Sequence, residues 1–473
     1  MNRSTREFRP GQAGCALILS LALLASGCST YMPPIVPSLS PPGEDEEVRI
    51  SREFRREAKK HLKFVNHPEV ERYIERIGQR ILSAMGPQPF DYRFFVVEDS
   101  QLNAFAVPGG SIYFYTGLIE KANSTSEIAG VLGHELVHIK GRHMARSSGP
   151  DAISVLSLLS MVLLARAGSG AQAAGSVGQA IAATRQIAYT RQLEMEADTL
   201  GVRYMAAAGY DPKGSLGFLR ILDQERALNP IDIPPYMMTH PITQERVANM
   251  ELVIRSLPKK EPNPEAYDSI EKIQTIIRME RHDRNAVVGE YEKLVRENPN
   301  SGERLYLLAF AQHLKGELSE AQQNYERALT INPNLPGLHR DLGRLYTHLG
   351  NIPAALAAFE RALGSEPKEP LNYLYLGELY EKTSEWREAA GAYLNARHLS
   401  PLWDKPAYRL GLVYSKLNRL GDARYFLAQS LLLQDEDDKA IAELEKAIKI
   451  FGETSPRGQA IRDEVKALRA RRR

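Results

Sequence analysis

The chain has 473 residues, of which 25% are charged and 43% are hydrophobic, and its formal net charge is +2. This length allows two or three domains, and the composition is that of an ordinary globular protein. The net charge falls to zero when residues 1–27 are left out. No basic field that would favour nucleic acid remains, so a nucleic-acid partner is not expected.

The chain begins with a segment that is typical of an export signal. Three arginines among the first nine residues precede an apolar run, Ala13 to Ala25, which is too short to count as a spanning helix. The run leads to Ser26-Gly27-Cys28, which is similar to a bacterial lipobox, although Ala25 stands where leucine is usual. We expect residues 1–27 to be a signal peptide and Cys28 to carry a lipid at the periplasmic face of the outer membrane. Ordinary cleavage that leaves a soluble exported protein is the alternative.

Residues 28–47 are predicted to be the lipidated N-terminus and a tether. Five prolines between Thr30 and Gly43 favour an extended, semi-rigid spacer. The acidic run Glu44 to Glu47 is interpreted as a solvated approach to a helix. Helical patterning then resumes from Val48 to Met85.

Two short stretches are predicted to be strands. Tyr92 to Val97 and Ser111 to Tyr115 are rich in aromatic and β-branched residues. Between them, Asn103 to Gly110 contains one proline and two glycines, which indicates an exposed strand edge or a tight turn.

The stretch from Ser124 to Arg146 is predicted to be a single helix that carries a metal site. It opens with a serine followed three residues later by Glu127, and apolar residues then recur at helical spacing. His134 and His138 lie four residues apart on one face, so both imidazoles can reach one Zn²⁺ ion. Glu135 suits a general base that takes a proton from the attacking water.

Two residues are candidates for a third metal ligand. His143 lies nine positions after His134, whereas the metzincin pattern requires ten, where this chain has Met144. Glu194 lies on another predicted helix, with Asp198 one turn later on the same face. We therefore expect Glu194 to bind the metal and Asp198 to orient a ligating histidine by a hydrogen bond. His143 is expected to be structural or to face the substrate.

The motif His-Glu-x-x-His, followed by Glu-x-x-Ala-Asp, resembles the gluzincin zinc metallopeptidases of the HtpX and CAAX-protease group. The upstream segment Asn103 to Gly110 and the downstream His240-Pro241 with Arg246 are also similar to the pattern of that family. The resemblance implies a zincin-type α+β metallopeptidase domain, mostly helical with a small sheet, which we assign to residues 48–257.

The resemblance also implies roles for single residues. One Zn²⁺ per chain would be bound by His134, His138 and Glu194. His240 would lie at the active site, either as a regulatory fourth ligand or as a stabiliser of the oxyanion. Arg246 is expected to pair with a carboxylate.

In the resembled family the segment before the second predicted strand lines the cleft. Asn103, Ala104, Phe105 and Ala106 would then form an edge to which an unfolded substrate adds as an extra strand. A plain hairpin that packs against the neighbouring helix is the alternative.

An apolar stretch from Ala152 to Ala165 precedes a segment from Gly168 to Ala183 that is rich in glycine, alanine and serine. Fourteen residues are too few to cross a bilayer, which requires about 20. The stretch is either a core helix with a flexible return or a lid over the cleft that contacts membrane or unfolded protein.

The C-terminal half repeats itself at a step of 34 residues, after a proline-containing linker at 258–267. Proline, alanine and glycine each recur in register, as Pro299, Pro333, Pro367 and Pro401, as Ala321, Ala355, Ala389 and Ala423, and as Gly343, Gly377 and Gly411. This is typical of tetratricopeptide helix–turn–helix units. We predict an all-α tetratricopeptide superhelix over residues 268–452 and a capping helix over residues 453–473.

Near its end the repeat slips by half a unit, because Ala440 follows Ala423 by only 17 residues. The helix near Asp422 to Gln434 is therefore predicted to close one repeat and open the next. The aromatic residues Tyr375, Trp386, Tyr393 and Trp403 are predicted to lie in the core of the array rather than in its groove.

These patterns, with the family resemblance, predict a periplasmic zinc endopeptidase that cleaves unfolded or misassembled proteins in outer-membrane quality control. The repeats would dock substrates or the outer-membrane assembly machinery. The alternative is a chaperone-like assembly factor in which proteolysis is secondary, and a Glu135→Gln variant would separate the two.

Overall fold

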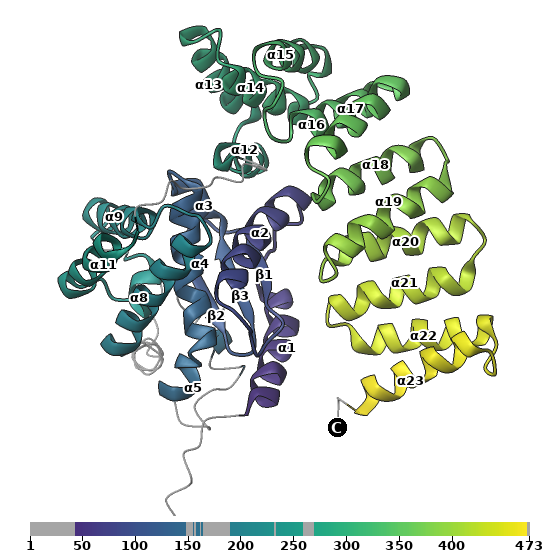
Figure 1. Cartoon of the computed structure of the whole chain (residues 1–473), viewed down its shortest axis with the longest axis horizontal. Coiled ribbons are helices and arrows are strands. Elements are labelled where there is room, and N and C mark those ends of the chain that lie inside the picture. Colours follow the sequence, from purple (N-terminus) through teal and green to yellow (C-terminus); the bar gives the residue numbers. More distant parts are fainter. Residues whose placement is uncertain are drawn as a thin grey trace, which may run out of the picture. The chain divides into compact units, whose positions relative to one another are not determined.

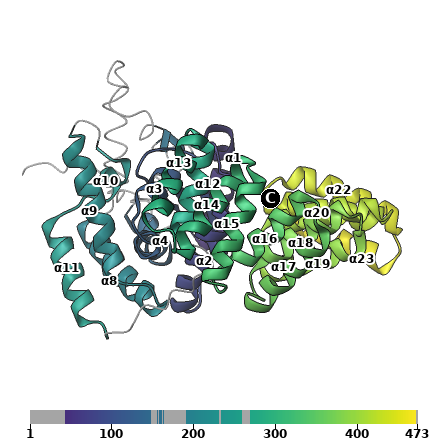
Figure 2. The same cartoon turned by 90° about the horizontal axis from the view of Figure 1, so that it is seen from above.

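The computed structural model describes residues 43–147, 155, 158–160, 162–163, 190–230, 233–258 and 269–470. The predicted signal peptide, the lipidated Cys28, most of the tether and most of the segment 152–183 lie outside these residues. Within them the chain is mostly helical with one small sheet, as Figures 1 and 2 show. The predicted fold class, an α+β region followed by an all-α array, is confirmed.

The sheet has three strands, β1 (Arg93–Val97), β2 (Ala104–Val107) and β3 (Ser111–Tyr115). Their order is β1-β3-β2, with β1 parallel and β2 antiparallel to the central β3. The two predicted strands are confirmed, and the segment between them supplies β2. No other strand of the described residues pairs with the outer edge of β2.

The segment was predicted to be an exposed strand edge or a tight turn; β2 is an outer strand of the sheet, and all four of its side chains are buried. Phe105 and Val107 belong to a hydrophobic cluster with Phe54 of α1 (Glu44–His61). Leu158 and Leu159 of the apolar segment lie in the same cluster. The described part of that segment is therefore packed into the core, as a core helix would be.

The acidic run was expected to be solvated, and this is confirmed for Glu44 and Asp45 but wrong for Glu47. Glu44 to Glu47 form the first turn of α1, where negative charge favours the positive end of the helix dipole. Glu47 is only 1% exposed, and it accepts a hydrogen bond of 2.7 Å from Arg142 Nε.

The helix predicted over Ser124 to Arg146 is two helices. The first, α4 (Thr125–Lys140), ends at Gly141, and Arg142 has a φ of 50°, a left-handed conformation that a right-handed helix cannot continue. The second, α5 (His143–Ser147), begins at the next residue. The remaining helices of this half are α2 (Pro68–Ala84), α3 (Thr116–Lys121), α8 (Arg191–Ala207), α9 (Lys213–Leu228), α10 (Pro235–Thr239) and α11 (Gln244–Ser256).

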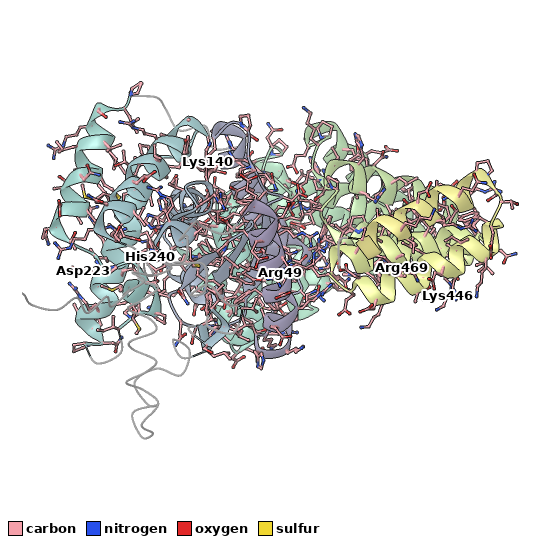
Figure 3. All side chains as sticks on the ribbon, turned by 90° about the horizontal axis from the view of Figure 1, so that it is seen from below. Arg49, Lys140, Asp223, His240, Lys446 and Arg469 are labelled. Carbon is pink, nitrogen blue, oxygen red and sulfur yellow. The ribbon has the colours of Figure 1, made fainter. Side chains whose placement is uncertain are left out.

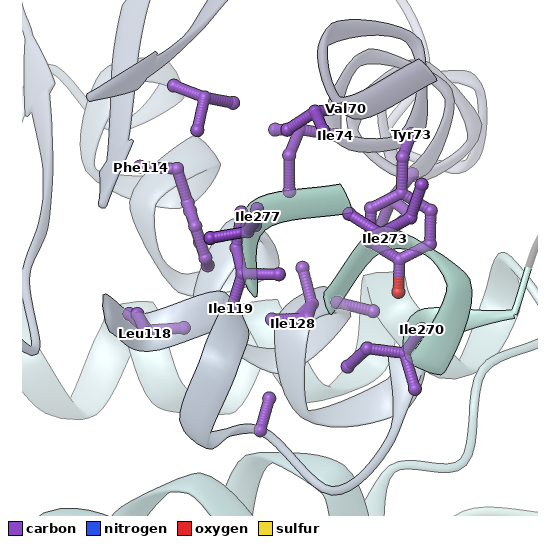
Figure 4. Packing of buried hydrophobic residues seen from close by; sticks show 14 of the residues in the cluster. Val70, Tyr73, Ile74, Phe114, Leu118, Ile119, Ile128, Ile270, Ile273 and Ile277 are labelled. Carbon is purple, nitrogen blue, oxygen red and sulfur yellow. The ribbon is translucent and has the colours of Figure 1, made fainter. Parts of the chain in front are cut away.

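The core of the N-terminal half extends into the first helix after the linker. Figure 4 shows three isoleucines of α12 (Ile270–Arg281) among buried side chains of α2, α3 and α4. Ile270, Ile273 and Ile277 of α12 are each at most 6% exposed. α12 also packs against α13 and α14, so it joins the core of the first half to the array.

The array that follows consists of antiparallel helix pairs. Its helices are α13 (Arg284–Glu297), α14 (Gly302–Lys315), α15 (Leu318–Ile331), α16 (Leu338–Leu349), α17 (Ile352–Ser365), α18 (Pro370–Lys382), α19 (Trp386–Leu399), α20 (Asp404–Lys416), α21 (Leu420–Leu433), α22 (Asp437–Phe451) and α23 (Pro456–Ala470). The recurring glycine is where paired helices touch: a Cβ atom on Gly377 would lie 2.5 Å from the ring of Tyr393. Tyr375, Tyr393 and Trp403 are buried, as predicted, whereas Trp386 is half-buried.

The slip in the repeat is visible as a shared helix. α21 packs against both α20 and α22, which confirms that it closes one repeat and opens the next. α23 covers the end of the array with buried Ile461 and Val465. None of the helices among the described residues combines the length and the apolar character that crossing a membrane requires.

Candidate metal centre

The helix that carries the two histidines is positioned by local contacts that its sequence specifies. The Ser124 hydroxyl caps α4 by accepting from the backbone N–H of Glu127 at 3.3 Å. Gly133 on α4 faces Gly201 on α8, and a Cβ atom on Gly133 would lie 3.0 Å from the Gly201 carbonyl oxygen. This close approach of α4 to α8 brings His134 to the carboxylates of α8.

Four buried side chains from three parts of the chain converge at this crossing. They are His134, His138, Glu194 and His240, and one ligand atom from each lies within 4.8 Å of every other. The Nε2 atoms of His134 and His138 are 2.9 Å apart. Glu194 Oε1 lies 3.3 Å from His138 Nε2 and 2.9 Å from His240 Nδ1. These separations suit donors around one ion, because ligands about 2.0–2.1 Å from zinc in a tetrahedron lie about 3.3 Å apart.

The protonation of His134 in this cluster is also compatible with a bound cation. Asp198 Oδ1 lies 3.0 Å from His134 Nδ1. An ionised carboxylate can only accept, so Nδ1 of His134 carries the proton and its Nε2 presents a lone pair to the centre. The Nε2 atom of His138 faces the same point. Two imidazole nitrogens and a carboxylate that converge on one point are a donor set that Zn²⁺ binds.

Arg246 holds the two carboxylates of α8 in place. It donates two hydrogen bonds to Asp198, from Nε at 2.7 Å and from Nη2 at 2.9 Å. Its Nη1 atom lies 2.7 Å from Glu194 Oε2. The expectation that Arg246 pairs with a carboxylate is confirmed. Burial opposes ionisation of Asp198, but the hydrogen bonds and charges of Arg246 and His134 together outweigh burial and lower the pKa of that carboxyl.

The two glutamates of the site differ in their electrostatic environment. Burial raises the pKa of Glu135, although the nearby His240 and His134 offset part of this effect. Burial also opposes ionisation of Glu194, but His240 and His134 outweigh it there, and the pKa of Glu194 lies well below its usual value. These directions agree with the predicted roles, Glu194 as an anionic ligand and Glu135 as a proton acceptor.

His240 follows α10 and is labelled in Figure 3. Its Nδ1 atom lies 3.3 Å from His134 Nε2, and its Nε2 atom lies 3.4 Å from Glu135 Oε1. The ring of Tyr236 stacks on His240 with the centroids 4.5 Å apart. The structure thus brings His240 among the predicted ligands, in contact with both the metal-facing nitrogens and the predicted base.

The other candidate ligand, His143, lies outside the cluster. It is completely buried, and its Nδ1 atom lies 2.9 Å from His138 Nδ1, on the side of His138 that faces away from the centre. Met144, which stands at the metzincin position, is buried in the hydrophobic cluster with Phe105.

The predicted substrate edge lies beside this helix. Ala104, Phe105 and Ala106 belong to β2, which packs against α4, and Asn103 directly precedes that strand. The Asn103 carbonyl accepts from the backbone N–H of Tyr115 at 3.1 Å, which joins it to β3.

Sequence reasoning missed three contributors to the site. Gly201 allows α4 and α8 to cross closely. A glycine inside a helical pattern is the sequence feature that could have predicted this contact. Tyr236 lies four residues before His240, the spacing of one helical turn, and this spacing could have found it. No local pattern predicts that Arg142 adopts a left-handed conformation.

Comparison with known proteins gives matches to both halves of the chain. Residues 68–253 match Peptidase family M48, and residues 314–374 match a tetratricopeptide repeat. A putative beta-barrel assembly-enhancing protease of Vibrio cholerae is 33% identical over 221 residues, which are 45% of this chain and 45% of that protein. The beta-barrel assembly-enhancing protease of Escherichia coli is 31% identical over 43% of each chain. The mitochondrial metalloendopeptidase OMA1 of Schizosaccharomyces pombe is 25% identical over 38% of this chain and 51% of that protein. The matches thus span about half the length of these relatives or less.

Proposed function

Because residues 68–253 form a Peptidase family M48 domain that tetratricopeptide repeats follow, we propose that the protein is a zinc-dependent endopeptidase. The observation that carries the proposal is the convergence of His134, His138 and Glu194 around one point, with Glu135 beside it. In this proposal the first three bind one Zn²⁺ ion per chain, and Glu135 is the general base.

The chemistry divides between the metal and the protein. When bound, Zn²⁺ acts as a Lewis acid on the scissile carbonyl and activates a water molecule for attack. Glu135 takes the proton of the attacking water and returns it to the leaving amine, so each peptide bond cleaved consumes one water. Its raised pKa brings Glu135 closer to neutral pH, which is where a general base is most effective. Asp198 and Arg246 hold His134 and Glu194 in position.

We propose that substrates bind as an extended strand along β2. Its outer edge has no strand partner among the described residues, and it lies against the helix that carries Glu135. Main-chain hydrogen bonds to residues 103–106 would accept many sequences, which suits unfolded proteins. The expected substrates are therefore unfolded or misassembled proteins, including those of the outer membrane; two relatives are named as beta-barrel assembly-enhancing proteases.

The repeats are proposed to dock substrates or an assembly partner in the outer membrane. Tetratricopeptide arrays present extended surfaces that bind segments of other proteins. The N-terminal sequence supports export to the periplasm and attachment through a lipid on Cys28, although this part lies outside the described residues.

A second candidate function rests on the position of His240. With His240 as a fourth protein donor, a tetrahedral ion has no open position for water, and such a site is structural or latent rather than active. A chaperone-like assembly factor in which proteolysis is secondary would be consistent with this arrangement.

The proposal is tested with the purified mature chain and its Glu135→Gln variant. We expect one zinc per chain in both proteins and casein cleavage only in the wild type, abolished by a chelator and restored by added zinc. Glu251→Gln, an exposed change of the same chemistry on α11, is the matched control and should cleave as the wild type does. Cleavage that persists in Glu135→Gln would contradict the assigned base, and wild-type protein without zinc would contradict the metal site.

A further inference from the structure

A second buried imidazole lies directly behind the proposed ligand His138. His143 Nδ1 is 2.9 Å from His138 Nδ1, and the two rings meet edge to face with centroids 4.9 Å apart. On the other side of the His143 ring, its Nε2 atom lies 3.5 Å from Glu196 Oε2. Glu196 is itself within 3.6 Å of Arg146 Nη1. The three side chains His138, His143 and Glu196 thus form a row that runs from the metal centre toward the surface.

The turn between α4 and α5 places His143 in this row. Arg142 has a φ of 50°, which reverses the chain after α4 and returns the next residue beneath His138. Its guanidinium is held by the buried Glu47 of α1, with Nε at 2.7 Å and Nη2 at 2.6 Å from Oε1. Gly141 leaves the space for the ring, because a Cβ atom there would lie 2.3 Å from His143 Nε2. Arg142, Glu47 and Gly141 therefore together hold the imidazole of His143 in one position.

Metal binding by His138 would define which atoms carry protons along the row. A histidine that binds metal through Nε2 presents a lone pair there, so His138 carries its proton on Nδ1 and donates it. The acceptor at 2.9 Å is His143 Nδ1, which must then be unprotonated. The proton of His143 is therefore on Nε2, where the carboxylate of Glu196 faces it. Both ring nitrogens of His143 thus have a polar neighbour, His138 Nδ1 at 2.9 Å and Glu196 Oε2 at 3.5 Å.

We propose that His143 is a positioning residue for the metal site: it accepts the Nδ1 proton of His138 and so fixes the tautomer and ring angle with which His138 meets the ion. The proposal rests on the proposed function, because it requires His138 to be a ligand. It parallels the role of Asp198 behind His134, but uses an imidazole in place of a carboxylate. Partners of this kind typically change metal affinity by about 10–100-fold when they are removed.

The test compares zinc affinity in two variants of the full mature chain, measured by competition with a chromophoric chelator. His143→Phe keeps a ring of similar size but cannot accept a hydrogen bond, and we expect it to weaken zinc binding by about 10–100-fold. His143→Asn keeps an acceptor close to the position of Nδ1, and we expect its affinity to stay within about threefold of the wild type because the hydrogen bond is retained. A residue that only fills space would give the opposite order.

Gly141→Ala tests the same position without changing the imidazole. Its new Cβ atom would displace the ring, so zinc affinity should fall in the same direction as in His143→Phe. His398→Phe, the same replacement at an exposed site in the repeats, is the control and should bind zinc as the wild type does. Melting of the metal-free proteins separates a loss of folding from a loss of affinity.

The outcomes separate this proposal from the proposed function. The role of His143 would be overturned if His143→Phe bound zinc as tightly as the wild type, or if His143→Asn bound zinc as weakly as His143→Phe. Neither result would affect the proposed function. Wild-type protein that binds zinc but does not cleave casein would contradict the proposed activity, and the order of zinc affinities would still decide for or against His143.

Discussion

The charge of Glu69 holds the N-terminal half of the chain to the repeats, and its removal should be costly. Glu69 begins α2 and is completely buried. Its carboxylate lies 2.5 Å from Lys272 Nζ of α12 and 2.5 Å from Arg344 Nη1 of α16. The Tyr375 hydroxyl of α18 lies 3.2 Å from Glu69 Oε1. The perturbation that we consider is Glu69→Gln, which keeps the shape of the side chain and removes its charge.

The magnitude follows from the two closest cations, since Arg340 Nη2 lies farther away, 3.6 Å from Glu69 Oε2. Unit charges 4 Å apart attract by about 4 kcal/mol at an effective dielectric constant of about 20, so Lys272 and Arg344 together supply about 8 kcal/mol. Burial of each ion costs several kcal/mol, which offsets part of this attraction. Breaking a buried pair by removing one partner typically costs about 3–5 kcal/mol, and we expect this loss in the free energy of unfolding of Glu69→Gln.

The same reasoning gives a dependence on pH. Burial opposes ionisation of Glu69, but Lys272, Arg344 and Arg340 outweigh burial, and the pKa of Glu69 lies well below its usual value. A depressed pKa means that the contribution of Glu69 is complete above the unfolded pKa, about 4.3, and is lost as the pH falls through the folded pKa. The difference in stability between wild type and Glu69→Gln should therefore be largest at neutral pH and should narrow below about pH 4.

Denaturant unfolding followed by tryptophan fluorescence is a suitable assay, because both tryptophans, Trp386 and Trp403, lie in the repeats. Glu57→Gln, an exposed change on α1, is the matched control and should stay within about 0.5 kcal/mol of the wild type. If Glu69→Gln were as stable as Glu57→Gln at neutral pH, the reasoning would be refuted, because the charge of Glu69 would then add no net free energy to the stability of the fold.

Two further predictions concern the metal centre and a second contact between the halves. His240→Ala should keep one zinc per chain, because three ligands remain, and should change the rate of casein cleavage, because one coordination position opens. If both the rate of cleavage and the zinc content stayed as in the wild type, His240 would have no role at the site. The Nε and Nη2 atoms of the buried Arg55 both donate to Asp435 at 2.7 Å. Asp435→Asn removes the anion that faces Arg55, so it should lower the free energy of unfolding by about 3 kcal/mol at neutral pH. Asp463→Asn, at an exposed site on α23, is its control, and equal midpoints in urea for the two variants would contradict this assignment.

Local patterns predicted the parts of this protein in which neighbours in sequence are neighbours in space. The cap at Ser124, the pair His134 and His138, and the step of 34 residues are all features of single helices or helix pairs, whose geometry is fixed by the backbone. The convergence of Glu194 with the histidines was predicted from spacing and family resemblance together, and the structure brings these residues to one point.

The failures have a common physical origin. The proline and glycines near β2 indicated an exposed strand edge or a tight turn, but they did not indicate that distant residues such as Phe54 and Leu158 cover its side chains. Glu47 was predicted to be solvated because it lies in an acidic run, but Arg142 is its partner 95 residues later. The pair Arg55 and Asp435 spans 380 residues. Such contacts leave no period in the sequence, because each consists of one pair of side chains at unrelated positions.

The buried charges of the described residues serve two different purposes, and the distinction follows from what faces them. At the joint with the repeats, Glu69 faces Lys272 and Arg344, so the protein itself supplies the compensating charge. At the crossing of α4 and α8, the Nε2 atoms of His134 and His138 lie 2.9 Å apart, and Glu194 Oε1 lies 3.3 Å from that of His138. Buried acceptors that face one another are destabilising unless a cation joins them. The first arrangement therefore stabilises the folded chain by itself, whereas the second would, in the proposed function, gain its stability from a bound cation.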